Sequence, residues 1–337
     1  MFLAAEFHDE ARAPEIVAGV FRESQIVTLA GNLNTGKTPL LKDWAVAIAA
    51  GLPWCGCATS QRPVIILDFE SDKGDFLRGL RDIAEKRGLL TTPLPIDAYI
   101  RRGRVTDPTC HEIQNMLDGN LESRFRWLEG KLRAQPNALF VMDPIQLFAN
   151  IDRNDFKAVT TFFTMFRNLQ VTYPQATWVF VYNIRKDDPT RKEPPNLLEN
   201  VQGWLQEISG SMDLQNRSDV RLGMQFMNRN DRDVVVLNGL RRGEVMEPFI
   251  LETAYLPLRD CDNSPREGGF ARVPAQGVKA DRVLSGKMYE AWLAMDSQFS
   301  IHDLLKICTT GTAYRLAERA VKLGLSRELE RGVFEKL

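Results

Sequence analysis

Histidine and cysteine are scarce in this chain, and their scarcity narrows the chemistry open to it. The 337 residues include three histidines and five cysteines. The histidines, at positions 8, 111 and 302, are too scattered to favour a catalytic triad or a multi-histidine metal site. The cysteines form no C-x-x-C pair, and an odd number without zinc spacing is typical of reduced thiols in the cytoplasm.

Long apolar runs and a net charge of either sign are missing as well. No segment reaches the length of a membrane span, and the first residues are too short and acidic a stretch for a signal peptide. We therefore expect a cytoplasmic protein with no membrane partner. Because the formal net charge is −1, any contact with nucleic acid must come from a local basic patch. The length favours two domains.

One motif stands out against this ordinary composition. Residues 31–38 match the phosphate-loop (P-loop) pattern G-x-x-x-x-G-K-[S/T]. The β-branched segment 25–30 before it favours a buried strand, and the apolar segment 40–50 after it favours a helix. In such a unit, backbone N–H groups and a lysine surround a polyphosphate, so we expect a bound nucleoside triphosphate rather than a Gly-rich surface turn. The residues expected around it are Gly31, Asn32, Leu33, Asn34, Thr35, Gly36, Lys37, Thr38 and Pro39.

Strand and helix patterns alternate after this loop. Apolar strand patterns at 63–68, 138–143 and 178–182 are separated by helical patterns at 73–87, 121–134 and 156–171. This alternation predicts an α/β fold with a mostly parallel, twisted sheet and helices on both faces. The later strand patterns at 220–226, 234–237 and 249–251 are expected to extend the sheet antiparallel at its edge, and 184–203 to form a long loop.

The chain is expected to divide into three parts. Residues 1–258 are predicted to form the nucleotide-binding domain, and the irregular stretch 259–281 a linker. In residues 282–337, three helical patterns precede a hairpin near Glu330-Arg-Gly332. This order is typical of a winged helix, a small α+β domain.

Carboxylates at two strand ends supply the other groups that a nucleotide hydrolase needs. Asp143 ends an apolar strand, where it could hold Mg²⁺ together with the hydroxyl of Thr38. Asp68 and Glu70 end another strand and share a face of it, so both could point at the same site. Strand ends are often polar only because they are wet, but the upstream P-loop favours the functional interpretation for Asp143 and Glu70.

These motifs, taken in order, resemble a known family. A P-loop, a strand ending in Asp68-Phe-Glu70 and a strand ending in Asp143-Pro144 resemble the RecA-like ATPase core. Within that core, Gly51-Leu-Pro-Trp-Cys-Gly56 and Val141-Met-Asp-Pro-Ile-Gln146 are similar to the RepA-type hexameric replicative helicases and the DnaB-like motors. The resemblance covers about residues 15–255. It implies a ring, expected to be a hexamer, that uses ATP and Mg²⁺ to move along single-stranded DNA for a plasmid, a phage or another mobile element.

The resemblance also implies roles for single residues. Glu70 would be the catalytic base, Lys37 the phosphate ligand and Asp143 the acid of the Mg²⁺ site. The family places a glutamine or histidine that senses the γ-phosphate after the next strand, and the shorter Asn183 stands at that point here. Its alternative role is a polar cap at the end of the strand.

A cation that reaches the neighbouring subunit's nucleotide is a further implication of the resemblance. The segment Leu237-Asn-Gly-Leu-Arg-Arg-Gly243 offers Arg241 or Arg242, although Gly239 stands where the family has a lysine. Such an arginine finger stabilises transition-state charge and can raise the rate ~10³–10⁵-fold. Two adjacent arginines in a turn are also typical of a solvated surface.

Basic residues at two places are candidates for DNA contact. The loop after Asn183 also carries acidic residues, so a solvated loop is an equal alternative, and the last helix carries its cations on one face. The C-terminal domain could bind DNA or dock replication or initiator proteins. The candidates are Arg185, Lys186, Arg191, Lys192, Arg217, Arg315, Arg319 and Lys322.

Two other functions are compatible with the same motifs. One is a nucleotide-switched DNA-binding regulator, initiator or loader that hydrolyses ATP slowly and does not unwind DNA. The other is a recombinase that forms helical filaments on DNA. The absence of the family's lysine at Gly239 and the short Asn183 favour the switch over the motor.

Overall fold

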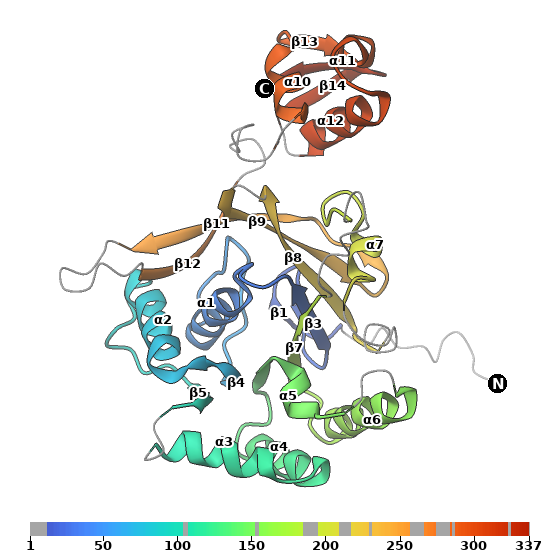
Figure 1. Ribbon diagram of the computed structural model, residues 1–337. Helices are drawn as coiled ribbons and strands as arrows, with labels where there is room; N and C mark the ends of the chain where they lie inside the picture. Colours follow the sequence, from blue (N-terminus) through green and yellow to red (C-terminus); the bar gives the residue numbers. More distant parts are fainter. Residues whose placement is uncertain are drawn as a thin grey trace, which may run out of the picture.

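A ten-stranded sheet forms the centre of the computed structural model, which describes residues 12–103, 107–151, 155–184, 195–208, 217–228, 231–256, 266–273, 284, 287–322 and 325–336. The strand order is β12-β11-β9-β8-β3-β7-β6-β4-β5, with β10 paired to β9 (Figure 1). The strands are β3 (Ile26–Gly31), β4 (Val64–Asp72), β5 (Ile96–Arg102), β6 (Leu139–Asp143), β7 (Thr177–Asn183), β8 (Val220–Asn228), β9 (Asp231–Arg241), β10 (Glu244–Val245), β11 (Phe249–Leu256) and β12 (Arg266–Arg272).

Most of the sheet is parallel. The six strands from β8 to β5 run in one direction, whereas β9, β11 and β12 alternate in direction at one edge. The α/β prediction is confirmed. The prediction of an antiparallel run at 220–226 is wrong, because β8 pairs in parallel with β3. The long connection from β7 lets the chain return before β8 begins, and the antiparallel edge starts only after the tight turn into β9.

Helices cover both faces of the sheet, because alternate residues of each buried strand face opposite sides. Val179 and Val181 of β7 belong to the core beneath α1, whereas Trp178 and Phe180 belong to the core beneath α4, α5 and α6. In the second core, the Phe166 ring lies 4.8 Å from that of Phe180. The helices of this domain are α1 (Lys37–Ala50), α2 (Lys73–Lys86), α3 (Pro108–Asp118), α4 (Leu121–Ala134), α5 (Ile145–Ala149), α6 (Phe156–Thr172) and α7 (Val201–Leu205).

Part of the predicted linker belongs to the sheet. Residues 266–272 form β12, which pairs with β11 and lies against α1 and α2. Phe270 of β12 is buried in the core beneath α1, and its backbone N–H donates to Asp43 Oδ2 at 3.0 Å. The linker assignment is therefore wrong for 266–272. The strand was missed because its sequence, Arg-Glu-Gly-Gly-Phe-Ala-Arg, has neither the alternation nor the β-branched residues of a typical strand.

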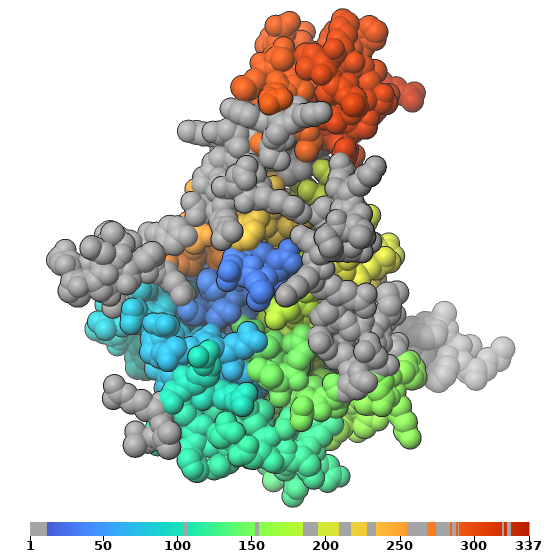
Figure 2. Space-filling view, in the orientation of Figure 1, coloured from blue at the N-terminus to red at the C-terminus, as the bar shows by residue number. Residues whose placement is uncertain are grey.

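The C-terminal residues form a small unit with its own three-stranded antiparallel sheet, ordered β13-β15-β14. Trp292, Phe299 and Phe334 stack in its core, with the Phe299 and Phe334 rings 5.5 Å apart. In the space-filling view this unit (orange to red) projects from the rest of the molecule (Figure 2). Its elements are α10 (Lys287–Ala294), β13 (Gln298–Ser300), α11 (Ile301–Ile307), α12 (Thr310–Lys322), β14 (Ser326–Glu330) and β15 (Val333–Lys336). Across the described parts of the chain, every helix is too short or too polar to cross a membrane.

Candidate functional site

The P-loop lies between the carboxyl end of β3 and the first turn of α1, as the sequence predicts. Two glycines are required there for different reasons. A Cβ on Gly31 would stand 2.7 Å from Thr35 Oγ1 and 2.8 Å from the carbonyl oxygen of Met224. Gly36 has a φ of 88°, which L side chains rarely adopt, and it directly precedes α1. The loop therefore turns tightly enough to bring its N–H groups and the helix N-terminus together.

Lys37, the first residue of α1, extends back into this loop. Its Nζ donates to the carbonyl oxygens of Gly31 and Asn32 at 2.9 and 2.8 Å. Burial lowers the pKa of Lys37, while the charges of Asp143 and Glu70 oppose that shift. An ammonium group in this place can exchange its carbonyl partners for phosphate oxygens without leaving the loop.

Thr38 connects the loop to β6. Its Oγ1 donates to Asp143 Oδ2 at 2.7 Å. Burial, together with the neighbouring charge of Asp68, raises the pKa of Asp143 to about 7, although the hydrogen bond from Thr38 and the charge of Lys37 oppose this rise. A carboxylate that is costly to ionise when alone is well suited to gain a cation.

Asp68 and Glu70 lie at the end of β4, the neighbour of β6. Asp68 is opposite Asp143 in the strand register, so the two carboxylates are adjacent across the sheet. Asp68 is 1% exposed. Its Oδ1 accepts the N–H groups of Glu70 and Ser71 at 3.0 and 2.7 Å, and its Oδ2 accepts the Ser71 hydroxyl at 2.7 Å.

The Glu70 side chain is exposed, and its charge acts on Lys37. The same backbone turn that Asp68 holds therefore presents a solvated carboxylate toward the P-loop. Asp68 shares a strand end with Glu70 in the sequence, but no pattern there gives it a role of its own. Its two acceptor oxygens make it the group that fixes the local backbone under Glu70.

Asn183 ends β7, where it is the register partner of Gly31 in the adjacent β3. Its side chain is half-buried. The next residue, Ile184, donates its N–H to the Gly31 carbonyl oxygen at 3.5 Å. The structure therefore brings Asn183 to the start of the P-loop, as expected for a residue that monitors bound phosphate, although its role stays a prediction.

The oxygen donors at this edge of the sheet fit Mg²⁺. Mg²⁺ in nucleotide sites takes one or two protein oxygens and completes its octahedron with phosphates and water. The Thr38 hydroxyl and the Asp143 carboxylate are already in contact, so they can act as a pair. No cluster of three or more His, Cys, Asp or Glu side chains suited to a metal occurs within the described residues, so a fully protein-made cage is not part of this site.

Arg241 and Arg242 lie far from this P-loop. Arg241, the last residue of β9, is the register partner of Val220, the first residue of β8, and β8 runs parallel to β3. Both arginines are thus at the edge where β3 begins, whereas the P-loop follows its other end. Six residues of strand separate the two edges by about 20 Å.

The candidates for DNA contact are divided by the structure. Arg185, Lys186, Arg191 and Lys192 fall outside the described residues. Arg217 is engaged with α6, since its Nη2 donates to Thr160 Oγ1 at 2.8 Å and its guanidinium lies over the Phe156 ring. Arg315, Arg319 and Lys322 are all on α12, and Arg315 Nε donates to the Gly311 carbonyl oxygen at 3.0 Å.

Comparison with known proteins adds a family match. A family model described as an AAA domain matches residues 3–188, more than half of the chain. This range includes the P-loop, Glu70, Asp143 and Asn183. Among solved structures, the ATPase domain of a phage helicase is similar over 72% of this chain and 84% of that chain, with 11% sequence identity and a TM-score of 0.47. No curated protein matches the sequence.

Proposed function

The chain belongs to the AAA domain family, and we propose on that basis that it is an ATP-dependent motor that assembles into a ring, hexameric in form, and acts on single-stranded DNA. The observation that carries the proposal is the contact of Thr38 with Asp143 beneath the P-loop, with Glu70 presented beside it. The proposal has three parts, which are hydrolysis, assembly and DNA contact.

Hydrolysis follows from the groups at the P-loop. The loop N–H groups and Lys37 bind the phosphates, and Thr38 with Asp143 holds Mg²⁺, which supplies charge neutralisation on the phosphate oxygens. Glu70 orients an attacking water and accepts its proton, since it is the solvated carboxylate whose charge acts on the loop lysine. Asn183, beside Gly31, is placed to hydrogen-bond the terminal phosphate.

Assembly follows from the distance between the arginines and the P-loop of the same chain. Arg241 and Arg242 are at the opposite edge of the sheet, so they cannot reach their own nucleotide without refolding β9. In a ring, that edge of one subunit can face the P-loop of the next, and an arginine there can stabilise transition-state charge. The nucleotide site is then shared between two copies.

DNA contact is supported by the C-terminal unit. Its order of α10, β13, α11, α12 and the β14–β15 hairpin is the order of a winged helix, and α12 carries Arg315, Arg319 and Lys322 along one face. We assign α12 as the DNA-facing helix of this unit. Docking of replication or initiator proteins on the same unit is the competing assignment.

The hydrolytic part is tested by two substitutions and one control. Lys37→Ala removes the phosphate ligand, so both ATP binding and turnover are lost. Glu70→Gln retains ATP binding within about twofold and lowers turnover by about 100-fold or more, because the proton acceptor is lost. Arg133→Ala, on the exposed face of α4, leaves both unchanged. Normal turnover in Glu70→Gln would remove the proposed base.

The motor is distinguished from a nucleotide-switched regulator by single-stranded DNA. A motor shows ATP turnover that the DNA stimulates and displaces a strand from a tailed duplex. A switch binds DNA in one nucleotide state but shows neither stimulation nor displacement, and that result would overturn the motor assignment. Helical filaments on DNA, instead of closed rings, in electron micrographs would identify a recombinase.

A further inference from the structure

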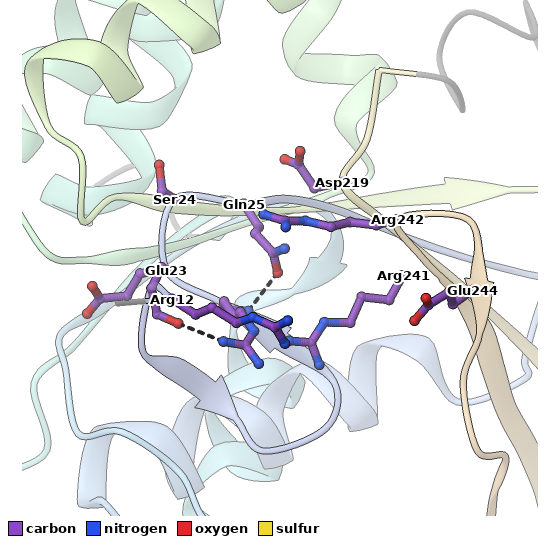
Figure 3. Close-up of a pocket in the computed structure, with 10 residues that line it drawn as sticks. Arg12, Glu23, Ser24, Gln25, Asp219, Arg241, Arg242 and Glu244 are labelled. Carbon is purple, nitrogen blue, oxygen red and sulfur yellow. Dashed lines mark hydrogen bonds between the residues drawn. The ribbon is translucent and has the colours of Figure 1, made fainter. Parts of the chain in front are cut away.

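A pocket of about 550 Å³ lies at the edge of the sheet opposite the P-loop (Figure 3). Arg241 and Arg242 line it, together with residues from the N-terminal segment and the start of β3. The N-terminal contribution includes Arg22, the last residue of the hairpin formed by β1 (Glu15–Val17) and β2 (Phe21–Arg22). The volume is in the range of pockets that take small ligands.

The acidic residues of this pocket include two that arginines outside it already neutralise. Glu23 pairs with Arg62 at 2.8 Å, and Arg62 is almost fully buried. Asp219 pairs with Arg167 at 3.0 Å and also accepts the Ile26 N–H at 2.8 Å. These two carboxylates therefore do not cancel the charge of the arginines that line the pocket.

Glu15 holds Arg22 and Arg241 side by side. Both guanidinium groups donate to the same oxygen, Oε1, at 2.8 and 2.9 Å, and the other oxygen accepts the Gly19 N–H at 3.2 Å. Burial alone would raise the pKa of Glu15, but these hydrogen bonds and the two arginine charges outweigh burial and lower it. Glu15 is thus an anionic bridge that brings two cations together and leaves the pair with a surplus positive charge.

Arg22 is fixed from three sides. Its Nη1 donates to the Ala13 carbonyl oxygen at 3.1 Å, its Nη2 to Glu15, and its backbone N–H to Gln25 Oε1 at 2.7 Å. Arg242 contrasts with it, because its side chain is exposed. One exposed and two clamped guanidinium groups therefore border one pocket.

We propose that Arg22, Arg241 and Arg242 form a single receptor for the terminal phosphates of the nucleotide bound to a neighbouring copy of this chain, with Glu15 as its positioning residue. This inference rests on the proposed function and extends it to the N-terminal hairpin. Guanidinium groups donate paired N–H bonds to phosphate oxygens, and convergent arginines suit a group with several such oxygens. Arg22 and Arg241 each keep N–H groups beyond those that Glu15 accepts.

The test uses the full chain, ATP with Mg²⁺, and mixtures of variants. Arg22→Ala is expected to lower kcat by about tenfold or more while the Kd for ATP, set by the P-loop of the same chain, stays within about twofold. Glu15→Gln, which keeps an acceptor oxygen but loses the charge, is expected to lower kcat by a smaller factor. Arg22→Lys keeps a cation on a long side chain, so it controls for folding and should retain part of the activity.

Mixing then shows whether Arg22 acts on the neighbour. Lys37→Ala subunits have intact arginines but no working P-loop, and Arg22→Ala subunits have the reverse. A 1:1 mixture should turn over ATP several times faster than the sum of the two separate preparations. Unchanged kcat in Arg22→Ala, or a loss that the mixture fails to restore, would overturn the inference.

A second mixture separates this failure from failure of the proposed function. A variant with both Arg241→Ala and Arg242→Ala is mixed with Lys37→Ala in the same way. If this mixture regains turnover and the Arg22→Ala mixture does not, Arg22 lies outside the shared site and only the inference falls. If neither mixture regains turnover, the shared nucleotide site of the proposed function falls with it.

Discussion

The Thr38 hydroxyl donates a 2.7 Å hydrogen bond to Asp143, a residue 105 positions further along the chain. This bond joins the first turn of α1 to the end of β6 and gives the P-loop a carboxylate at its base. Because Asp143 is buried beside Asp68, the carboxylate is costly to ionise, and burial is the largest cause of its raised pKa of about 7. The site is therefore built at some expense of stability and has a measurable pH dependence.

The first prediction concerns that pH dependence. The folded state binds a proton at Asp143 up to about pH 7, whereas an unfolded chain releases it near 3.8. Stability from this group is therefore present below pH 4 and is lost as pH rises through 7. The full cost is up to about 4 kcal/mol. In urea unfolding without nucleotide or Mg²⁺, Asp143→Asn should gain stability relative to wild type between pH 4 and 8. A difference that does not change with pH would contradict the assignment.

The second prediction concerns Asp68 as the support of Glu70. Asp68→Asn keeps the side-chain shape but loses one charged acceptor under the turn, so Glu70 is held less firmly. We expect kcat to fall by about tenfold with ATP affinity unchanged within about twofold. Combining it with Glu70→Gln should add little, because both act on one group. Asp72→Asn, which alters the cap of α2, should leave kcat unchanged. A full additive loss in the double variant would contradict the coupling.

The third prediction concerns the stability that Asp43 provides. This α1 carboxylate is 1% exposed and accepts hydrogen bonds from Trp54 Nε1, Arg87 Nη2 and the Phe270 N–H at 3.0, 2.7 and 3.0 Å. Asp43→Ala leaves a charge and two further donors unpaired, so a loss of about 3–5 kcal/mol in the free energy of unfolding is expected. The exposed Asp75→Ala should cost less than about 1 kcal/mol. Equal effects of the two variants in urea unfolding would show that the contact of β12 with α1 contributes little.

The fourth prediction concerns Gly36. Its φ of 88° and the Phe270 ring, 3.2 Å from where a Cβ would lie, both oppose any side chain. Gly36→Ala should therefore lower ATP affinity by about tenfold or more, because the loop N–H groups turn away from the phosphates. Phe270→Ala alone relieves only the steric part, so it should not rescue Gly36→Ala in an equilibrium ATP-binding measurement. Rescue would show that the ring contact, not the backbone conformation, decides the effect.

Local patterns predicted much of this molecule, because they depend on residues close in the chain. The P-loop, the strands β3, β4, β6 and β7, and the helices α4 and α6 follow from apolar periodicity and turn residues. The edge elements did not. The half-exposed β5 (Ile96–Arg102) and the Gly-containing β12 owe their conformation to pairing with β4 and β11, and no nearby residue announces that pairing.

The candidate site shows the same division. That Asp143 and Glu70 end strands was visible in the sequence, but the adjacency of Asp68 and Asp143 depends on the order of β4 and β6 in the sheet. The Glu15–Arg241 contact spans 226 positions and joins the N-terminal hairpin to the antiparallel edge, so no motif could reveal it. Charge partners that meet only through tertiary structure are the part that sequence patterns cannot supply.

The most direct test of a shared nucleotide site is the ATP turnover per subunit measured across a range of protein concentrations, with sedimentation recording the assembly state in the same buffer. A site shared between copies predicts that turnover per subunit is low for the lone subunit and rises in step with the fraction assembled. Full turnover by a lone subunit, in the presence of Mg²⁺ and single-stranded DNA, would contradict the shared site.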